Sequence, residues 1–180
     1  MTGAKALESD FLRGRRMINL DSEEDDAIYI GCAGGCDVTL RWSEPTMDPT
    51  GAVEGVAITV SGLQGGHSGC DIHLGRGNAV KVAVAVAIES GVEGLRLASL
   101  EGGSKRNAIP REASLVIVAP LAGADAIEAA ARSMESRLHA SGETAARVTV
   151  ERIPAVPATG RTTAGRILRC LHVLPSGVLA

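Results

Sequence analysis

The alternation of apolar and polar positions predicts a series of short elements from residue 53 onward. Val56, Ile58 and Val60 share one face of a predicted strand at 53–61. The segment 78–90 is expected to be a helix because of its length and because a glycine follows it. This segment is apolar on nearly all sides, so we expect it to be buried on more than one face, although its β-branched residues make a strand conceivable.

The later segments complete a repeated β-α-β pattern. Strands are expected at 95–100, 114–119 and 147–153, and an amphipathic helix at 123–140. The order strand, helix, strand, strand, helix, strand matches a ferredoxin-like α/β sandwich, an antiparallel sheet with two helices on one face. Further short strands are expected at 16–20, 27–30 and 36–42, and a final helix at 160–174. The predicted fold class is therefore α+β with a strand-rich N-terminal extension.

The composition allows one domain, or one domain with an appendage, in a chain of 180 residues. Hydrophobic residues make up 45% of the chain but aromatic residues only 2%, so the core must consist of smaller aliphatic side chains. A core of this kind, together with a helix that is apolar all round, suggests a hydrophobic surface that needs a partner. We therefore expect the chain to self-associate.

Charge and cysteine content favour a cytoplasmic protein. The net charge of −3 argues against nucleic acid or an anionic membrane as the main partner. No apolar run approaches the ~20 residues that span a bilayer, and the N-terminus lacks the pattern of a signal peptide. The four cysteines form no C-x-x-C pair, which favours reduced thiols over a zinc site or a disulfide framework.

The most informative motif is the glycine-rich run Gly-Gly-His-Ser-Gly at 65–69. Glycines let the backbone turn sharply and leave room for a ligand, so His67 is presented outward between a predicted strand and a predicted helix. An imidazole held in this way can donate a hydrogen bond to an oxyanion or shuttle a proton. The alternative is a turn that includes a surface histidine.

Three further candidates lie elsewhere in the chain. Asn107 precedes Ala-Ile-Pro, and its amide both donates and accepts, which suits a peptide backbone, although a turn asparagine is the alternative. Arg106, with Lys105 and Arg111, forms a basic cluster for a carboxylate or a solvated strand end. Asp21 follows a predicted strand and is suited either to a metal or to a helix N-cap.

Three stretches together resemble the aminoacyl-histidine (Xaa-His) dipeptidases of the M20 zinc metallopeptidases. They are N-L-D-S-E-E at 19–24 with I-Y-I-G-C-A-G-G at 28–35, G-G-H-S-G at 65–69 with I-H-L-G-R-G-N at 72–78, and G-G at 102–103 with R-N-A-I-P-R-E-A at 106–113. The resemblance implies a cytoplasmic enzyme in which a catalytic domain with two zinc ions is interrupted by a smaller lid domain that mediates homodimerisation.

The chain lacks the H-x-D that this family places around its zinc ions, and its one comparable pair, Glu23-Glu24, follows the N-L-D motif and does not match the family's Glu-Glu. The resemblance therefore implies a lid domain at 37–158, preceded at 1–36 by a flank of the catalytic domain. Residues 159–180 would form a helix that returns towards the catalytic domain. The chain by itself is expected to be inactive on dipeptides.

The resemblance also assigns roles to individual residues. It implies that His67 reaches into the partner subunit's active site and stabilises the tetrahedral intermediate, that Asn107 binds substrate, and that Asp21 is a zinc ligand of the parent enzyme. Arg106 is a candidate for the substrate carboxylate. Many family members carry an arginine for this purpose where the present chain has Pro120, so this assignment stays open.

A non-enzymatic interpretation uses the same residues differently. In a ferredoxin-like small-molecule sensor or assembly module, the glycine-rich loop would bind an anion at the start of the helix at 78–90. RNA binding through the basic cluster is a third possibility, but the predicted sheet lacks the stacking aromatic residues that such domains use.

Overall fold

The computed structural model describes residues 34–178 without a gap and, before them, residues 6, 8, 10–11, 13–16, 26–28 and 30–31. It divides into two units, Met1–Arg41 and Trp42–Ala180. The predicted zinc ligand Asp21 and most of the predicted strand at 16–20 lie outside the described residues.

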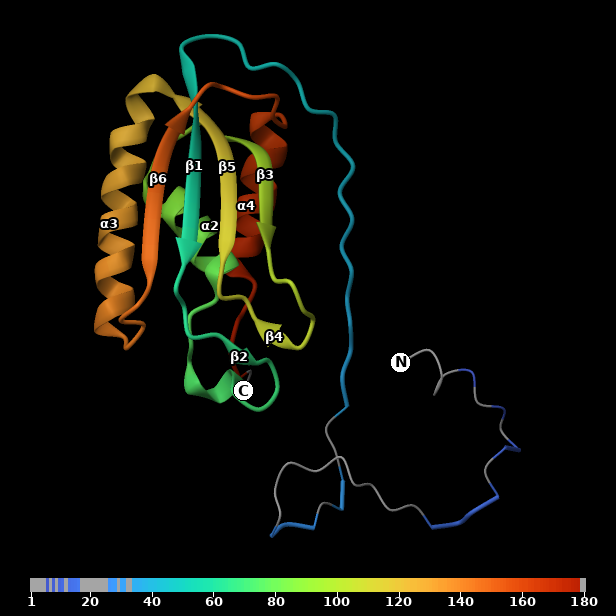
Figure 1. Ribbon diagram of the computed structural model, residues 1–180. Helices are drawn as coiled ribbons and strands as arrows, with labels where there is room; N and C mark the ends of the chain where they lie inside the picture. Colours follow the sequence, from blue (N-terminus) through green and yellow to red (C-terminus); the bar gives the residue numbers. More distant parts are fainter. Residues whose placement is uncertain are drawn as a thin grey trace. The chain divides into compact units, whose positions relative to one another are not determined.

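The second unit is built on a four-stranded antiparallel sheet. Its strands are β1 (Val53–Ser61), β3 (Arg96–Gly102), β5 (Ala113–Pro120) and β6 (Arg147–Ile153). Their order across the sheet is β3-β5-β1-β6, and each neighbouring pair is antiparallel (Figure 1). Two β-α-β units interleaved in this way define the ferredoxin-like arrangement, so the predicted fold class is confirmed.

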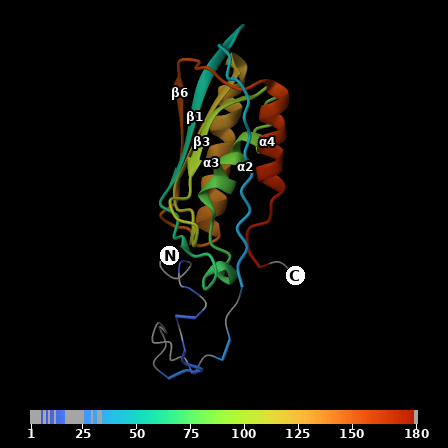
Figure 2. The ribbon, with the colours of Figure 1, turned by 90° about the vertical axis from the view of Figure 1, so that its right-hand side faces the viewer.

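Three helices of the described chain cover one face of this sheet (Figures 1 and 2). They are α2 (Ala79–Glu89), α3 (Ala124–Ala140) and α4 (Arg161–Val173). Helix α2 packs against the sheet and lies between α3 and α4. The helix count differs from the predicted two because α4 joins the same layer and buries Ala164 and Leu168 in the common core.

The position of α2 explains its sequence and removes one argument for self-association, though not the prediction itself. Its apolar residues are covered by the sheet below and by a helix on each side, so the chain itself buries the surface that was expected to need a partner. The core is aliphatic, and its largest fully buried side chains include Ile58, Leu115 and Ile117. The all-apolar helix is therefore evidence for a three-helix layer and not for self-association.

The strands predicted at 27–30 and 36–42 are wrong for the residues that the structure describes there. Val38, Leu40 and Trp42 do alternate, but they are 79%, 66% and 53% exposed and their segment pairs with no strand in the described chain. Alternation predicts only which side chains share a face, whereas a strand forms when its backbone finds a hydrogen-bonding partner. Within the described residues, no helix has both the length and the hydropathy needed to cross a membrane.

Candidate functional site

Two very short strands bring the two informative motifs of the second unit together. Strand β2 (Gly66–His67) pairs antiparallel with β4 (Ala108–Ile109), so that His67 lies opposite Ala108. The N–H of Ser68 also donates to the carbonyl oxygen of Asn107 at 2.9 Å. The sequence offered no sign of this ladder, because two residues are too few to show a periodic pattern.

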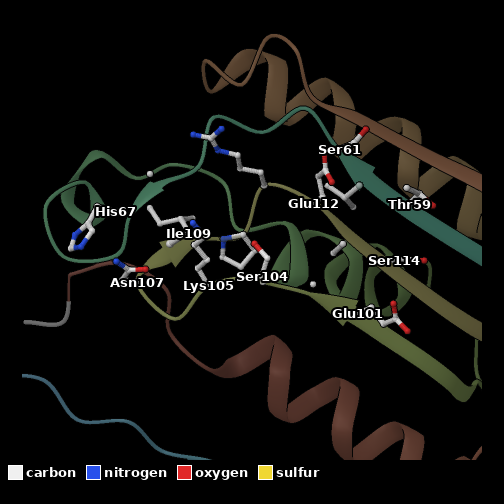
Figure 3. Close-up of a pocket in the computed structure, with 18 residues that line it drawn as sticks. Thr59, Ser61, His67, Glu101, Ser104, Lys105, Asn107, Ile109, Glu112 and Ser114 are labelled. Carbon is white, nitrogen blue, oxygen red and sulfur yellow. The ribbon is translucent and has the colours of Figure 1, made fainter. Parts of the chain in front are cut away.

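His67 and Asn107 line an open cavity of about 1170 Å³ next to the end of the main sheet. In Figure 3 the two side chains lie next to each other at one end, while Thr59, Ser114 and Glu101 lie towards the strands. The cavity combines hydroxyl groups, carboxylates and the basic residues Lys105 and Arg111 among its lining residues. It therefore offers both donors and acceptors to a small polar ligand.

The hydrogen bonds of the His67 ring engage one of its two nitrogens and leave the other available. Its Nδ1 atom lies 3.1 Å from the backbone nitrogen of Gly69 and 3.1 Å from that of Cys70, and both N–H groups donate to it. An acceptor nitrogen carries no proton, so we assign the neutral ring the tautomer with hydrogen on Nε2. The exposed ring then presents Nε2–H as a donor.

The backbone around His67 is held by an aspartate and an arginine from the same loop. Asp71 Oδ2 accepts the N–H of His67 at 2.8 Å, and the N–H of Asp71 donates to the carbonyl oxygen of His67 at 3.0 Å. Arg76 Nη1 donates to the carbonyl oxygen of Gly65 at 2.7 Å and lies 3.4 Å from Asp71 Oδ2. We call this set of contacts the Asp71–Arg76 clasp.

Gly66 lies so close to the two side chains of the clasp that a β-carbon at this position would contact both. Its φ is +148°, and a β-carbon added to it would lie 2.5 Å from Arg76 Nη1 and 2.7 Å from Asp71 Oδ2. Both distances are shorter than any normal contact of a β-carbon, and the backbone conformation itself disfavours other residues. Gly66 therefore serves a close approach between the loop backbone and two charged side chains.

The structure brings some predicted site residues together and leaves others apart. His67 and Asn107 share the cavity, as do Lys105 and Arg111 of the basic cluster. Arg106 is exposed and does not belong to the residues that line it. The roles of His67, Asn107 and Arg106 in binding or catalysis stay predictions.

The described residues do not form a metal site. Among them, no group of three or more histidine, cysteine, aspartate or glutamate side chains could hold a metal ion. Structural and catalytic zinc sites need at least three protein ligands. The described part of the chain therefore does not fit the zinc centre that the sequence resemblance implies, and it offers hydrogen-bond donors instead.

Comparisons with known proteins find similarity to peptidases. Residues 58–146 match a family model described as a peptidase dimerisation domain. Over 118 residues the chain is 44% identical to the cytosol non-specific dipeptidase of Escherichia coli K12, which covers 65% of this chain and 24% of that protein.

A solved structure is similar over a longer stretch. The crystal structure of aminoacylhistidine dipeptidase from Vibrio alginolyticus aligns with a TM-score of 0.73 and 33% identity, covering 100% of this chain and 38% of that one. The chain thus spans between 24% and 38% of the length of these two relatives.

Proposed function

We propose that the chain belongs to the M20 family and is the lid and dimerisation part of a longer dipeptide hydrolase, since residues 58–146 match a peptidase dimerisation domain. The two relatives described above are both named as dipeptidases, which favours an enzyme over a small-molecule sensor or assembly module. In this proposal residues 37–158 form the lid and residues 1–36 belong to the catalytic domain. Residues 159–180 lead back to the catalytic domain, and their helix α4 also packs on the core of the lid.

One observation carries the proposed role of His67, namely the two backbone N–H groups that hold its Nδ1. They leave Nε2–H as a fixed donor for the oxygen that becomes negatively charged when a nucleophile attacks the peptide carbonyl. A preorganised donor of this type is worth about 3–4 kcal/mol in the transition state. We propose that this donor enters the active site of the partner subunit in a homodimer, which the name of the domain family supports.

The proposed reaction needs zinc, and we propose that the metal binds outside the described residues. Two zinc ions, when bound, would supply an activated water to the peptide carbonyl. Asp21 is the residue of this chain that would contribute a ligand, together with residues of the longer protein. The described residues hold and orient the substrate and stabilise charge.

The substrate is proposed to be a dipeptide whose backbone is held by the Asn107 amide. Lys105 and Arg111 line the cavity and are suited to its carboxylate, and Arg106 remains a further candidate. A preference for Xaa-His dipeptides rests on the Vibrio relative alone, since the Escherichia coli relative is named non-specific. The word cytosol in the name of the Escherichia coli relative supports the proposal of a cytoplasmic location.

The role of His67 in trans can be tested by mixing two inactive variants of the complete enzyme. His67→Ala removes the donor and Asp21→Ala removes a proposed metal ligand, and each variant alone should lose dipeptidase activity. Random exchange of subunits makes half of the dimers mixed, and each mixed dimer has one intact site, so about one quarter of the wild-type activity should return.

Two outcomes would contradict this proposal. If His67 acts within its own subunit, neither site of a mixed dimer is complete and the mixture stays inactive. If His67→Ala alone keeps its kcat, the residue stabilises no transition state, because loss of one such donor should lower kcat about 100- to 1000-fold. His73→Ala, at an exposed position of the same loop, is the matched control and should keep its activity.

A further inference from the structure

Among the described residues, Glu143 is the charged side chain that is buried, with 3% of its surface exposed. It lies in the turn between α3 and β6, far in sequence from either motif of the site. Its backbone is fixed there, since its N–H donates to the carbonyl oxygen of Leu138 at 3.0 Å and its own carbonyl oxygen accepts the N–H of Ala146 at 3.0 Å.

The carboxylate of Glu143 binds both ends of the loop that carries His67. Its Oε2 accepts the N–H of Gln64 at 2.8 Å, just before the glycine-rich motif. Its Oε1 accepts the N–H of Gly77 at 2.8 Å, just before the N-cap of α2. Hydrogen bonds to an ionised carboxylate are stronger than those between neutral groups. One side chain therefore closes the base of the loop 64–77.

Neighbouring contacts show that the loop base is built against this turn. The side-chain amide of Gln64 donates to the carbonyl oxygen of Gly142 at 2.9 Å. A β-carbon added to Gly62, whose φ is +73°, would lie 2.2 Å from the carbonyl oxygen of Ala145. Leu63, which is 4% exposed, packs in the core between these contacts. The turn and the loop base thus meet without space for another group.

We propose that Glu143 is a positioning residue, which fixes the loop base so that the imidazole of His67 keeps its orientation. This inference rests on the proposed function of His67. The Asp71–Arg76 clasp holds the loop internally, but its contacts all lie between residues 65 and 76. Contacts within the loop cannot orient it relative to the sheet. The pairing of β2 with β4 ties the loop to the sheet at His67, and Glu143 ties it at its base from the α3–β6 turn.

The test compares Glu143→Ala with a matched control, Glu135→Ala, in the 180-residue chain. Glu135 Oε2 also accepts a backbone N–H, that of Val148 at 2.8 Å, but it makes no bond to the loop. Hydrogen exchange would be followed at the amides of Gly69 and Cys70, which donate to the His67 ring, together with the ring ¹⁵N shifts that report its tautomer.

In Glu143→Ala we expect these two amides to exchange about 10- to 100-fold faster and the His67 tautomer to become mixed, while amides of β1 and β5 keep their protection. Glu135→Ala should change neither the loop amides nor the ring shifts. Unchanged protection at Gly69 and Cys70 with a single tautomer would overturn the proposal, and so would an equal loss of protection throughout the sheet.

A second variant and an activity measurement keep the inference separate from the proposed function. Should Glu143→Ala not fold, Glu143→Gln keeps the volume and can accept one of the two N–H groups, so an intermediate exchange rate is expected. In the complete enzyme, Glu143→Ala should lower kcat about 10- to 100-fold and leave KM unchanged. If His67→Ala impairs kcat and Glu143→Ala does not, this inference fails alone. If His67→Ala has no effect, the proposed function fails instead.

Discussion

Replacing Gly66 with alanine gives a sharp test of how the His67 loop is held. The added β-carbon would lie 2.5 Å from Arg76 Nη1 and 2.7 Å from Asp71 Oδ2, so at least one partner of the clasp has to move. Arg76 Nη1 donates to the neighbouring carbonyl oxygen of Gly65 at 2.7 Å, and Asp71 Oδ2 accepts the N–H of His67 at 2.8 Å. The substitution therefore strains the backbone and displaces the ends of the Arg76 and Asp71 side chains, and a hydrogen bond of the clasp is lost where that displacement cannot be absorbed.

These two effects have known sizes. An unfavourable backbone conformation costs about 1–3 kcal/mol and a lost hydrogen bond to a charged group about 1.5–3 kcal/mol, so the sum is about 2.5–6 kcal/mol if the loop stays in place and the hydrogen bond is lost completely. The loop can instead detach while the sheet remains folded. We therefore expect the free energy of unfolding to fall by less than this sum and the loop to lose its order.

Gly75→Ala is the matched control for this prediction. Gly75 lies in the same loop with a φ of +65°, but a β-carbon added there meets no atom within 4 Å. Its substitution should cost only the backbone strain, about 1–2 kcal/mol. Urea unfolding would give the stability of both variants, and hydrogen exchange at Gly69 and Cys70 would report the order of the loop. Equal effects of the two substitutions, within about 0.5 kcal/mol and with unchanged exchange, would refute the steric reasoning.

Two further predictions concern the scaffold. Leu115→Ala should lower the free energy of unfolding by about 2–5 kcal/mol without changing the urea m-value, because the Leu115 side chain is fully buried on the helix-covered face of the sheet. Val116→Ala, on the opposite face, should cost less, and equal losses would contradict the packing described here. Asn78→Ala should cost about 1 kcal/mol, since Asn78 Oδ1 accepts the N–H groups of Val80 and Lys81 at 3.1 and 3.3 Å, and Asn78→Ser should retain most of that stability. No loss in Asn78→Ala would mean that the cap contributes nothing.

The ferredoxin-like core was predictable because each of its elements carries its own local signal. The strand predicted at 53–61 has the observed bounds, and α2 was expected within a residue or two of its actual ends. The meaning of the apolar surface of α2 was not predictable, because a sequence shows that a surface must be covered and not what covers it. The C-terminal helix that helps to cover it had been expected to lead away from this core.

The elements that were missed or wrong share one physical cause. The strand predicted at 36–42 has the right alternation but no backbone partner in the described chain, while β2 and β4 pair although neither is long enough to alternate. Pairing depends on where distant segments lie, and that information is not local. Electrostatic interactions between distant segments are equally invisible in the local sequence. The pKa of Arg152 on β6 is raised above its usual value by hydrogen bonds to two carboxylates of α3, first that of Asp125 and then that of Glu128.

For the candidate site, the sequence identified two groups that line the cavity and missed the groups that hold the His67 loop. His67 and Asn107 were recognisable because they stand in unusual local contexts, and both line the cavity. Glu143 stands in Ser-Gly-Glu-Thr, a sequence typical of a solvated turn, yet it is buried and closes a loop that begins 79 residues earlier. No local pattern distinguishes such a residue from an exposed one.

Aliphatic packing holds the scaffold and directional hydrogen bonds hold the site, so the two parts respond differently to substitution. The scaffold consists of aliphatic side chains, whose packing tolerates changes that conserve volume. The His67 loop has few buried apolar residues, and its order depends on the pairing of β2 with β4 and on a small set of directional bonds from Asp71, Arg76 and Glu143. A directional bond is lost when one atom is missing or displaced, so single substitutions should disorder the site while the sheet stays folded. A loop of this kind presents a donor accurately only while every one of these bonds is present.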